Sequence, residues 1–203
     1  HCVGVASGVC EAAARFAASV RDVFVWVAVL AALGVDYGGL RGASLADRAA
    51  AAARIGGVGL VGALVALAFQ LTGSLAVDGH ALEVATHGQL VLNAGTLALK
   101  ALLFLLGLLV LPLAARTIST PQVSEYFALL LLATLGMGFM VTSRNLLGAF
   151  VALELVSLSL YAFTALNPAR KESAEAALKY FTYGGVASAF LLFGISYLFG
   201  ALG

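Results

Sequence analysis

Three ionisable side chains interrupt long apolar stretches of this sequence. Glu154 lies in GAFVALELVSLSLYAF, Lys179 in ALKYFTYGG and Lys100 in LALKALLFLLGLLVL. A charge at mid-bilayer costs from about 3 to more than 10 kcal/mol, so such groups turn towards protein or water and usually mark an ion or proton path. We therefore expect these side chains to face the interior of a helix bundle. The functional role of Lys100 is left open, because the start of its apolar stretch is uncertain.

The residues near these groups suggest how each is placed. On a helix, Ser157 at i+3 and Tyr161 at i+7 share the face of Glu154, which predicts a polar stripe lining a hydrated path or a hydrogen-bonded helix seam. Tyr183 shares the face of Lys179 in the same way. Each acid or base also has a structural alternative. Glu154 could belong to a buried structural pair, and Lys179 could pair with Glu175 at i−4 and reach the membrane interface.

An acid and a base on facing helices can handle protons together. Burial disfavours the charged form of a lysine and a nearby carboxylate favours it, so moving or neutralising the carboxylate changes the proton affinity of the lysine. A short connection joins the stretches that carry Glu154 and Lys179. Counting from this connection predicts depths that differ by about 5 Å at 1.5 Å per residue.

The composition is that of an integral membrane protein. The chain has 203 residues, 62% hydrophobic and 10% charged, with a mean hydropathy of +1.05, and a net charge of +1 that does not favour nucleic acid. A soluble enzyme is excluded, and the motifs of serine or cysteine hydrolases are missing. The two cysteines and the histidines His80 and His87 lack the spacing of metal ligands, so no metal site is predicted.

Hydropathy predicts an all-α, polytopic bundle of about six transmembrane helices in a single domain, 1–203, with 1–19 as a possible processed or extramembrane segment. The expected spans are residues 20–35, 55–71, 89–114, 126–142, 146–166 and 174–202. Asn167 and Pro168 are expected to stop the fifth span, and Ser173 to cap the sixth. Many Gly and Ala residues within the spans predict close helix packing.

Basic residues predict the orientation of the bundle. Six fall in the connections after the first, third and fifth spans, against Arg144 alone in those after the second and fourth. The six are Arg41, Arg48, Arg54, Arg116, Arg170 and Lys171. Basic loops stay on the cytoplasmic side, so the odd-numbered connections are expected to face the cytoplasm or the mitochondrial matrix.

Two blocks, LELVSLSLY around Glu154 and EAALKYF around Lys179, resemble the antiporter-like subunit N (subunit 2 in mitochondria) of respiratory complex I, the NADH:quinone oxidoreductase. The likeness runs from Glu125 to Gly203, and residues 126–203 would hold the core helices. It implies that Glu154 is the essential acid of a proton half-channel, that Lys179 is its partner, and that redox energy released elsewhere drives translocation. It also implies no flavin, iron–sulfur cluster or ubiquinone site in this chain.

The sequence departs from the family in two ways. Ser159 stands where the family usually has proline, and the chain stops at Gly203, before the further lysine-bearing helices of the family. We therefore expect a split or truncated subunit, with membrane lipid, other membrane-arm subunits and a separate chain carrying the remaining helices as its partners. The start at His1 and the alanine-rich composition favour the mitochondrial inner membrane, with a bacterial plasma membrane as the alternative.

Two other functions remain open at this stage. The first is a subunit of a multi-chain cation/proton antiporter, which would use the same pairing of an acid with a lysine. The second is a structural subunit of complex I that packs in the membrane arm and pumps nothing.

Overall fold

The computed structural model describes residues 23–34, 44–74, 93–118, 121–167 and 169–202. The segment 1–19, both cysteines and all three histidines lie outside this part of the chain. The described residues form helices at Val23–Gly34, α2 (Leu45–Ser74), α4 (Ala94–Thr117), α5 (Val123–Thr142), α6 (Leu146–Thr164) and α7 (Lys171–Leu202). All but the first are long and apolar enough to cross a membrane, which confirms the predicted all-α transmembrane fold.

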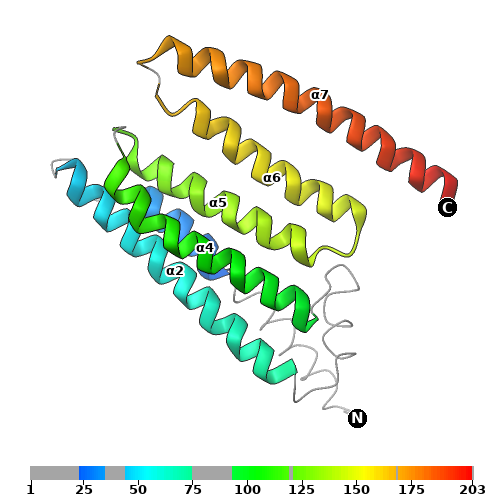
Figure 1. Ribbon diagram of the computed structural model, residues 1–203, viewed down its shortest axis with the longest axis horizontal. Helices are drawn as coiled ribbons and strands as arrows, with labels where there is room; N and C mark the ends of the chain where they lie inside the picture. Colours follow the sequence, from blue (N-terminus) through cyan, green and yellow to red (C-terminus); the bar gives the residue numbers. More distant parts are fainter. Residues whose placement is uncertain (1–22, 35–43, 75–92, 119–120, 168, 203) are drawn as a thin grey trace.

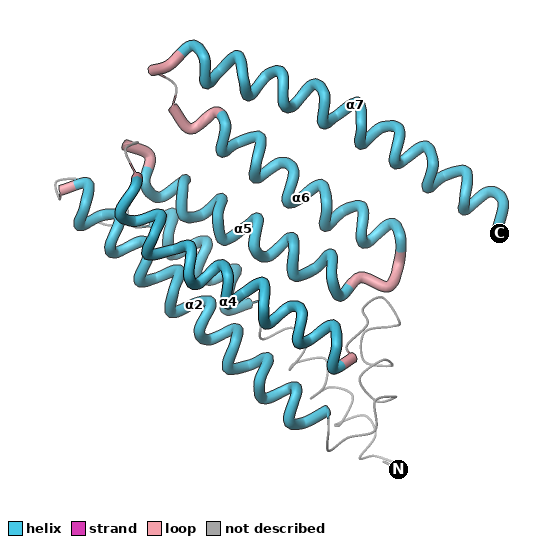
Figure 2. Tube along the Cα trace, in the orientation of Figure 1, coloured by secondary structure: helices cyan, strands magenta, loops and turns pink. Residues whose placement is uncertain are grey.

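The helices follow one another across the molecule, as Figure 1 shows. Helices α2, α4 and α5 pack against one another, α6 packs on α5, and α7 packs on α6. The turns in Figure 2 join consecutive helices at alternating ends, so α4 to α7 run up and down. In α7, Ile195 is the one buried residue among those described, so one side of this helix is open.

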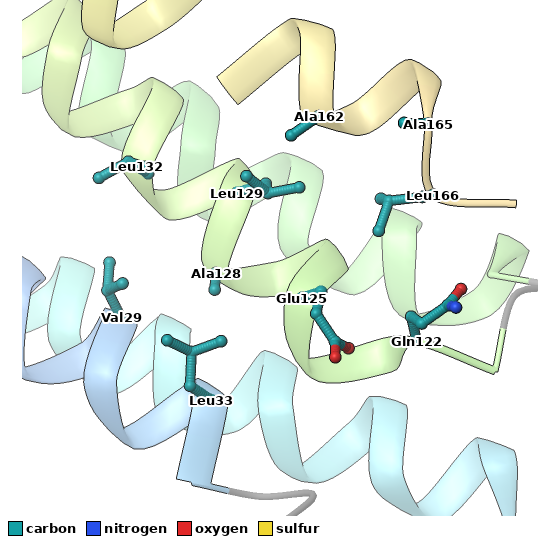
Figure 3. Close-up of a pocket in the computed structure, with 10 residues that line it drawn as sticks. All are labelled: Val29, Leu33, Gln122, Glu125, Ala128, Leu129, Leu132, Ala162, Ala165 and Leu166. Atoms are coloured by element: carbon teal, nitrogen blue, oxygen red, sulfur yellow. The ribbon is translucent and has the colours of Figure 1, made fainter. Parts of the chain in front are cut away.

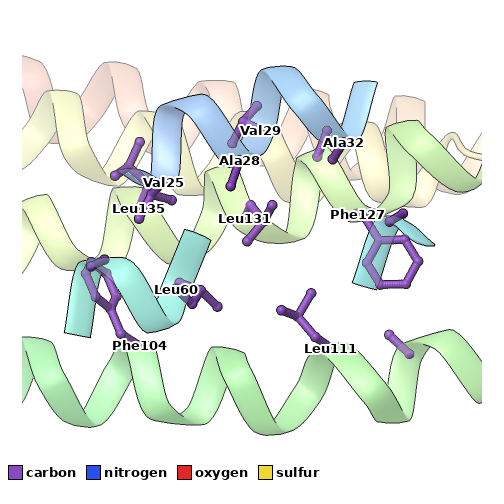
Figure 4. Close-up of a cluster of buried hydrophobic side chains, with 14 of the residues drawn as sticks. Val25, Ala28, Val29, Ala32, Leu60, Phe104, Leu111, Phe127, Leu131 and Leu135 are labelled. Carbon is purple, nitrogen blue, oxygen red and sulfur yellow. The ribbon is translucent and has the colours of Figure 1, made fainter. Parts of the chain in front are cut away.

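The tightest core lies between helix Val23–Gly34, α2, α4 and α5 (Figure 4). Leu60 of α2, Phe104 of α4 and Phe127, Leu131 and Leu135 of α5 belong to this core, all with 0% exposure. A Cβ atom added at Gly59 of α2 would clash with the Cβ atom of Ala28. Small residues thus bring these helices together, as predicted from the glycine and alanine content.

Helix α2 begins ten residues before the predicted start at residue 55. Ser44 sets this start: its Oγ donates to Asp47 Oδ2 at 2.7 Å and accepts from the Asp47 backbone N–H at 3.2 Å. The alanine run that follows favours helix without adding the hydropathy of a membrane core. Hydropathy therefore finds the membrane-embedded part of a helix and misses the turns that extend beyond it.

The prediction that Ser173 caps the last helix is wrong, because α7 begins at Lys171. The Ser173 hydroxyl instead donates to the carbonyl oxygen of Thr164, the last residue of α6. This bond satisfies a carbonyl at the end of one helix from the first turn of the next. It ties α6 to α7 at their connection.

Most of the basic residues counted for orientation lie in helix ends and not in connections. Arg48 and Arg54 are within α2, Arg116 is in the last turn of α4, and Lys171 starts α7, while Arg41 lies outside the described residues. The start of α2, the end of α4 and the start of α7 lie together at the end of the bundle opposite the α5–α6 connection, which holds Arg144 (Figure 1). The excess of basic residues at one end of the bundle therefore remains, although the helix boundaries differ from the predicted ones. The orientation in the membrane stays a prediction.

Candidate functional site

Glu154 is the ninth residue of α6 and lies at its middle, as predicted. The side chain is partly buried, and its Oε1 atom is buried without a hydrogen-bond partner among the described residues. A buried carboxyl oxygen costs free energy unless it is hydrogen-bonded, protonated or hydrated. Its surroundings therefore call for a proton, a water molecule or a donor from elsewhere.

The face of α6 that carries Glu154 is directed towards α7. Tyr161, two turns further along this face, meets Tyr180 and Phe181 of α7 edge to face, with ring centroids 4.8 and 5.7 Å apart. Gly184 leaves the space for the Tyr161 hydroxyl. Ser157 is partly buried on the same face. The predicted stripe of Glu154, Ser157 and Tyr161 thus lies along the contact between α6 and α7.

The opposite face of α6 is held against α5. A Cβ atom at Gly136 of α5 would lie 2.8 Å from Val156 Cγ2 and 3.3 Å from the Ala152 carbonyl oxygen. The glycine therefore allows the two backbones to approach closely. Since Glu154 is between Ala152 and Val156 in sequence, this contact fixes the depth and rotation at which α6 presents its carboxyl group.

Ser159 keeps α6 continuous through the position where the resembled family usually has proline. Its Oγ donates to the Leu155 carbonyl oxygen at 2.7 Å, and the helix runs unbroken from Leu146 to Thr164. A proline there would have no N–H to offer that carbonyl. Glu154 is therefore carried by a regular helix with a fixed side-chain direction.

Lys179 is not directed towards Glu154 within the described chain. Its Nζ donates to Glu175 Oε1 at 2.5 Å, and both side chains are about two thirds exposed, at 66% and 65%. Gly184 marks the side of α7 that faces α6, because it contacts Tyr161. Lys179 is five residues before Gly184, a rotation of about 140° around the helix, so Lys179 and Tyr183 point away from α6. The inward orientation expected for Lys179 is thus not found. Lys179 instead forms the structural alternative, the exposed pair with Glu175.

Glu154 and Lys179 also differ more in depth than the expected 5 Å. The Tyr161 ring packs beside Tyr180 and Phe181, the residues that follow Lys179. Glu154 is seven residues before Tyr161, or about 10 Å along the helix. The estimate only counted residues from the connection, whereas the ring contacts show which residues of the two helices are level.

Lys100 is the ionisable residue that the described structure buries completely. It lies on α4 with 0% exposure, and its Nζ is 5.6 Å from the ring centroid of Phe104 and 5.2 Å from that of Phe139. A Cβ atom at Gly138 of α5 would come within 2.9 Å of Lys100 Cε. Sequence analysis named Lys100 without finding this recess, because the role of Gly138 depends on which helix faces it.

Two cavities of about 530 Å³ lie beside α5 and α6. One, shown in Figure 3, is lined by apolar residues of helix Val23–Gly34, α5 and α6, with Glu125 and Gln122 at one edge. The other follows α5 and α6 from Phe139 past Ser143 and Asn145 to Ala152 and Leu155, on the side of α6 that faces α5. No group of three metal-ligating side chains occurs among the described residues.

The helices that carry Glu154 and Lys179 match a known family. Residues 143–203 match the transmembrane family of the NADH:quinone oxidoreductase/Mrp antiporter proteins. NADH-quinone oxidoreductase subunit N 2 of Acidobacterium capsulatum is 45% identical over 125 residues, which cover 57% of this chain and 25% of the relative. Subunit N of Anaeromyxobacter sp. is 36% identical over 144 residues, which cover 70% of this chain and 28% of the relative.

This chain is similar to NADH-quinone oxidoreductase subunit N. A third relative, subunit N of Neisseria gonorrhoeae, is 51% identical over 79 residues, 39% of this chain and 16% of the relative. The resemblance predicted from the blocks around Glu154 and Lys179 is confirmed. The chain spans about a quarter of the length of the first two subunits N.

Proposed function

We propose that this chain is a proton-translocating part of the membrane arm of an NADH:quinone oxidoreductase, with Glu154 as a proton-exchanging group. The observation that carries the proposal is a carboxyl group at the middle of a membrane-spanning helix with one buried oxygen lacking a partner among the described residues. The similarity to subunit N supports it, because that subunit belongs by name to such an oxidoreductase. The chain itself would carry out no redox chemistry.

The residues of the chain suggest a sequence of proton steps. Glu154 takes a proton from water that reaches the contact between α6 and α7, which neutralises the carboxylate and lowers the cost of its burial. Ser157 and Tyr161 continue the polar face towards α7 and can pass hydrogen bonds along it. Lys179 would act on the far side of α7, exchanging protons with groups that cover that face. In this form of the proposal the acid and the lysine are coupled through α7 and not by direct contact.

The partners follow from the same proposal. Other membrane-arm subunits, a separate chain carrying the remaining helices and membrane lipid would surround this bundle, and the exposed side of α7 with Lys179 is where the remaining helices would pack. Flavin, iron–sulfur clusters and ubiquinone would be held elsewhere in the complex. The relatives named above are bacterial, which favours a bacterial plasma membrane; the mitochondrial inner membrane stays a prediction from the sequence.

A cation/proton antiporter remains a second candidate, because the matching family includes Mrp antiporter proteins. Purification of the complex from membranes separates the two. Iron–sulfur subunits that travel with this chain support the oxidoreductase, and a complex that lacks them supports the antiporter.

Substitution of Glu154 tests the proposed role directly. In membrane vesicles that contain the assembled complex, Glu154→Gln is expected to lower NADH-driven proton uptake by about 100-fold, the lower end of the range for loss of a proton-transfer group. Fluorescence quenching of a pH-sensitive dye measures the uptake, and a native gel measures assembly. Glu172→Gln, at the exposed start of α7, is the matched control and should behave as wild type.

The structural alternative predicts a different result. If Glu154→Gln assembled and pumped at the wild-type rate, the chain would be a structural subunit and the proposal would be wrong.

A further inference from the structure

The cavity between helix Val23–Gly34, α5 and α6 has no part in the proposed proton path. Its volume is about 530 Å³, and it is open on one side. Sites for small molecules typically have about 300–1,000 Å³. Apolar side chains from all three helices form the walls, among them Leu33, Leu132 and Ala162 (Figure 3). A ligand that enters this cavity therefore needs an apolar part.

The cavity runs from the membrane surface to the middle of the bilayer. Along α5 it extends from Gln122, the residue before the first turn, to Leu132 at the middle of the helix. Ten positions along a helix cover about 15 Å, and half of a hydrocarbon core of about 30 Å has the same length. The cavity thus matches the depth that the acyl chains of one leaflet occupy.

An acyl chain suits this cavity better than a further helix does. A helix is at least about 10 Å wide with its side chains and rises about 1.5 Å per residue, so about five residues would use up a volume of this size. A helix that spans the membrane has about 20 residues. An acyl chain is thinner and bends to follow the walls. Since lipid tails are all as apolar as leucine, the choice between lipids falls to the polar end of the cavity.

Two hydrogen-bond acceptors lie at the surface end of the cavity (Figure 3). Gln122 Oε1 is buried and has no hydrogen-bond partner in the described part of the chain. Glu125 adds an exposed carboxyl group in the first turn of α5. The helix dipole favours an acid in this turn, but it does not satisfy the amide oxygen beside it. None of the described residues that line the cavity is basic, so both acceptors call for a cation with several N–H groups.

A phosphoethanolamine headgroup complements this end of the cavity. Its ammonium group has three N–H donors, which can serve Gln122 Oε1 and the Glu125 carboxylate together. Its phosphate is negative, and Arg48 brings a positive charge to the same end, where its Nη2 donates to the Pro121 carbonyl oxygen at 3.2 Å. A choline headgroup has no N–H to donate, and a glycerol headgroup offers Glu125 no positive charge.

We propose that this cavity binds a phospholipid with an ethanolamine headgroup, phosphatidylethanolamine. One acyl chain lies along the α5 wall towards Leu132, and the ammonium group binds Gln122 and Glu125 at the membrane surface. The lipid fills the space between helix Val23–Gly34 and α6 and braces both against α5. The proposal does not depend on proton transfer by Glu154.

Photolabelling of this chain within the purified, assembled complex tests the choice of lipid. The probe is phosphatidylethanolamine with a diazirine at the end of one acyl chain, and mass spectrometry locates the label on peptides of α5 and α6. Unlabelled dioleoyl phosphatidylethanolamine should displace the probe about tenfold better than the choline or glycerol lipid, the lower end for a hydrogen bond to a charged group. Equal displacement by the three lipids overturns the proposal.

Substitutions at the polar end test the two acceptors. Glu125→Gln and Gln122→Leu are each expected to lower labelling of these peptides, Glu125→Gln by about tenfold because it removes the charged acceptor. Glu172→Gln is the matched control, since Glu172 is also an acid in the first turn of a helix at this end of the bundle. It should label as wild type. Wild-type labelling in Glu125→Gln contradicts the proposed headgroup site.

A substitution in the wall tests the acyl-chain site separately. Ala162→Phe places a ring in the cavity and should lower labelling, whereas Leu160→Phe, on an exposed part of α6 outside the cavity, should not. Assembly is checked on a native gel. A wild-type cavity that takes no label, together with loss of assembly in Ala162→Phe alone, would mean that a protein segment occupies the cavity, and the proposal would be wrong. Proton uptake is not the readout, so failure of the proposed function leaves this test unaffected.

Discussion

At the scale of single residues, the described structure separates the two groups that were expected to pair. Glu154 has a buried oxygen without a described partner, while Lys179 is exposed and held by Glu175 on its own helix. An exposed pair at i and i+4 contributes about 0.3–0.5 kcal/mol. The pair with Glu175 is therefore too weak to fix Lys179 if a stronger partner covers that face of α7.

Separate substitutions of this pair show which residue matters. Glu175→Gln is expected to leave proton uptake and assembly unchanged, because it removes a weak surface interaction. Lys179→Met should lower uptake if Lys179 exchanges protons as the resemblance implies. Proton uptake is measured in vesicles for both variants, and a native gel checks that each complex assembles. The comparison shows whether Lys179 takes part in proton transfer. Equal uptake by both variants would assign Lys179 a surface role.

At the scale of elements, glycines set how closely the helices approach. Gly136 brings α5 to the backbone of α6, and Gly184 admits the Tyr161 ring between α6 and α7. Gly185, next to it, meets nothing within 4 Å. Neighbouring glycines of one motif thus have different roles, and the direction of each around its helix decides which one is required.

A pair of glycine variants measures this difference. Gly136→Ala is expected to lower stability by about 1–3 kcal/mol, because the added methyl group overpacks the contact with Val156. Gly185→Ala should be neutral or stabilising by up to about 1 kcal/mol, since alanine favours helix and the space is open. Thermal unfolding of the purified protein in detergent, followed by circular dichroism, measures both. A Gly136→Ala protein as stable as wild type would mean that α5 and α6 are further apart than described.

At the scale of the whole molecule, the bundle is asymmetric. Helix Val23–Gly34, α2, α4 and α5 share a compact core, while α6 and α7 extend from it as single layers (Figure 1). Tyr183, Phe190 and Tyr197 of α7 are 70–77% exposed. The compact side encloses Lys100, and the extended side carries Glu154 and Lys179, so α5 is the element that links the two.

The orientation of this bundle can be tested by labelling. In a background with Cys2→Ser and Cys10→Ser, Ala169→Cys at the α6–α7 connection should react with an impermeant reagent from the cytoplasmic side, next to Arg170. Leu146→Cys, at the start of α6 near Arg144, should react from the opposite side. Labelling in intact cells is compared with labelling in inverted vesicles, which shows from which side of the membrane each cysteine reacts. The reverse pattern would invert the predicted orientation.

The sequence by itself determined the membrane class, the order of the apolar helices, the central position of Glu154 and the likeness to subunit N. Hydropathy, the cost of buried charge and two specific blocks are local properties that need no knowledge of neighbours. The early start of α2 and the role of Ser173 were not predicted, because capping and polar helical turns leave little trace in hydropathy. The tertiary structure alone decided that Lys179 faces away from α6 and that Lys100 is buried beside Gly138 of α5. These relations depend on which face of each helix its neighbours cover, and that choice is made by contacts between residues far apart in the chain.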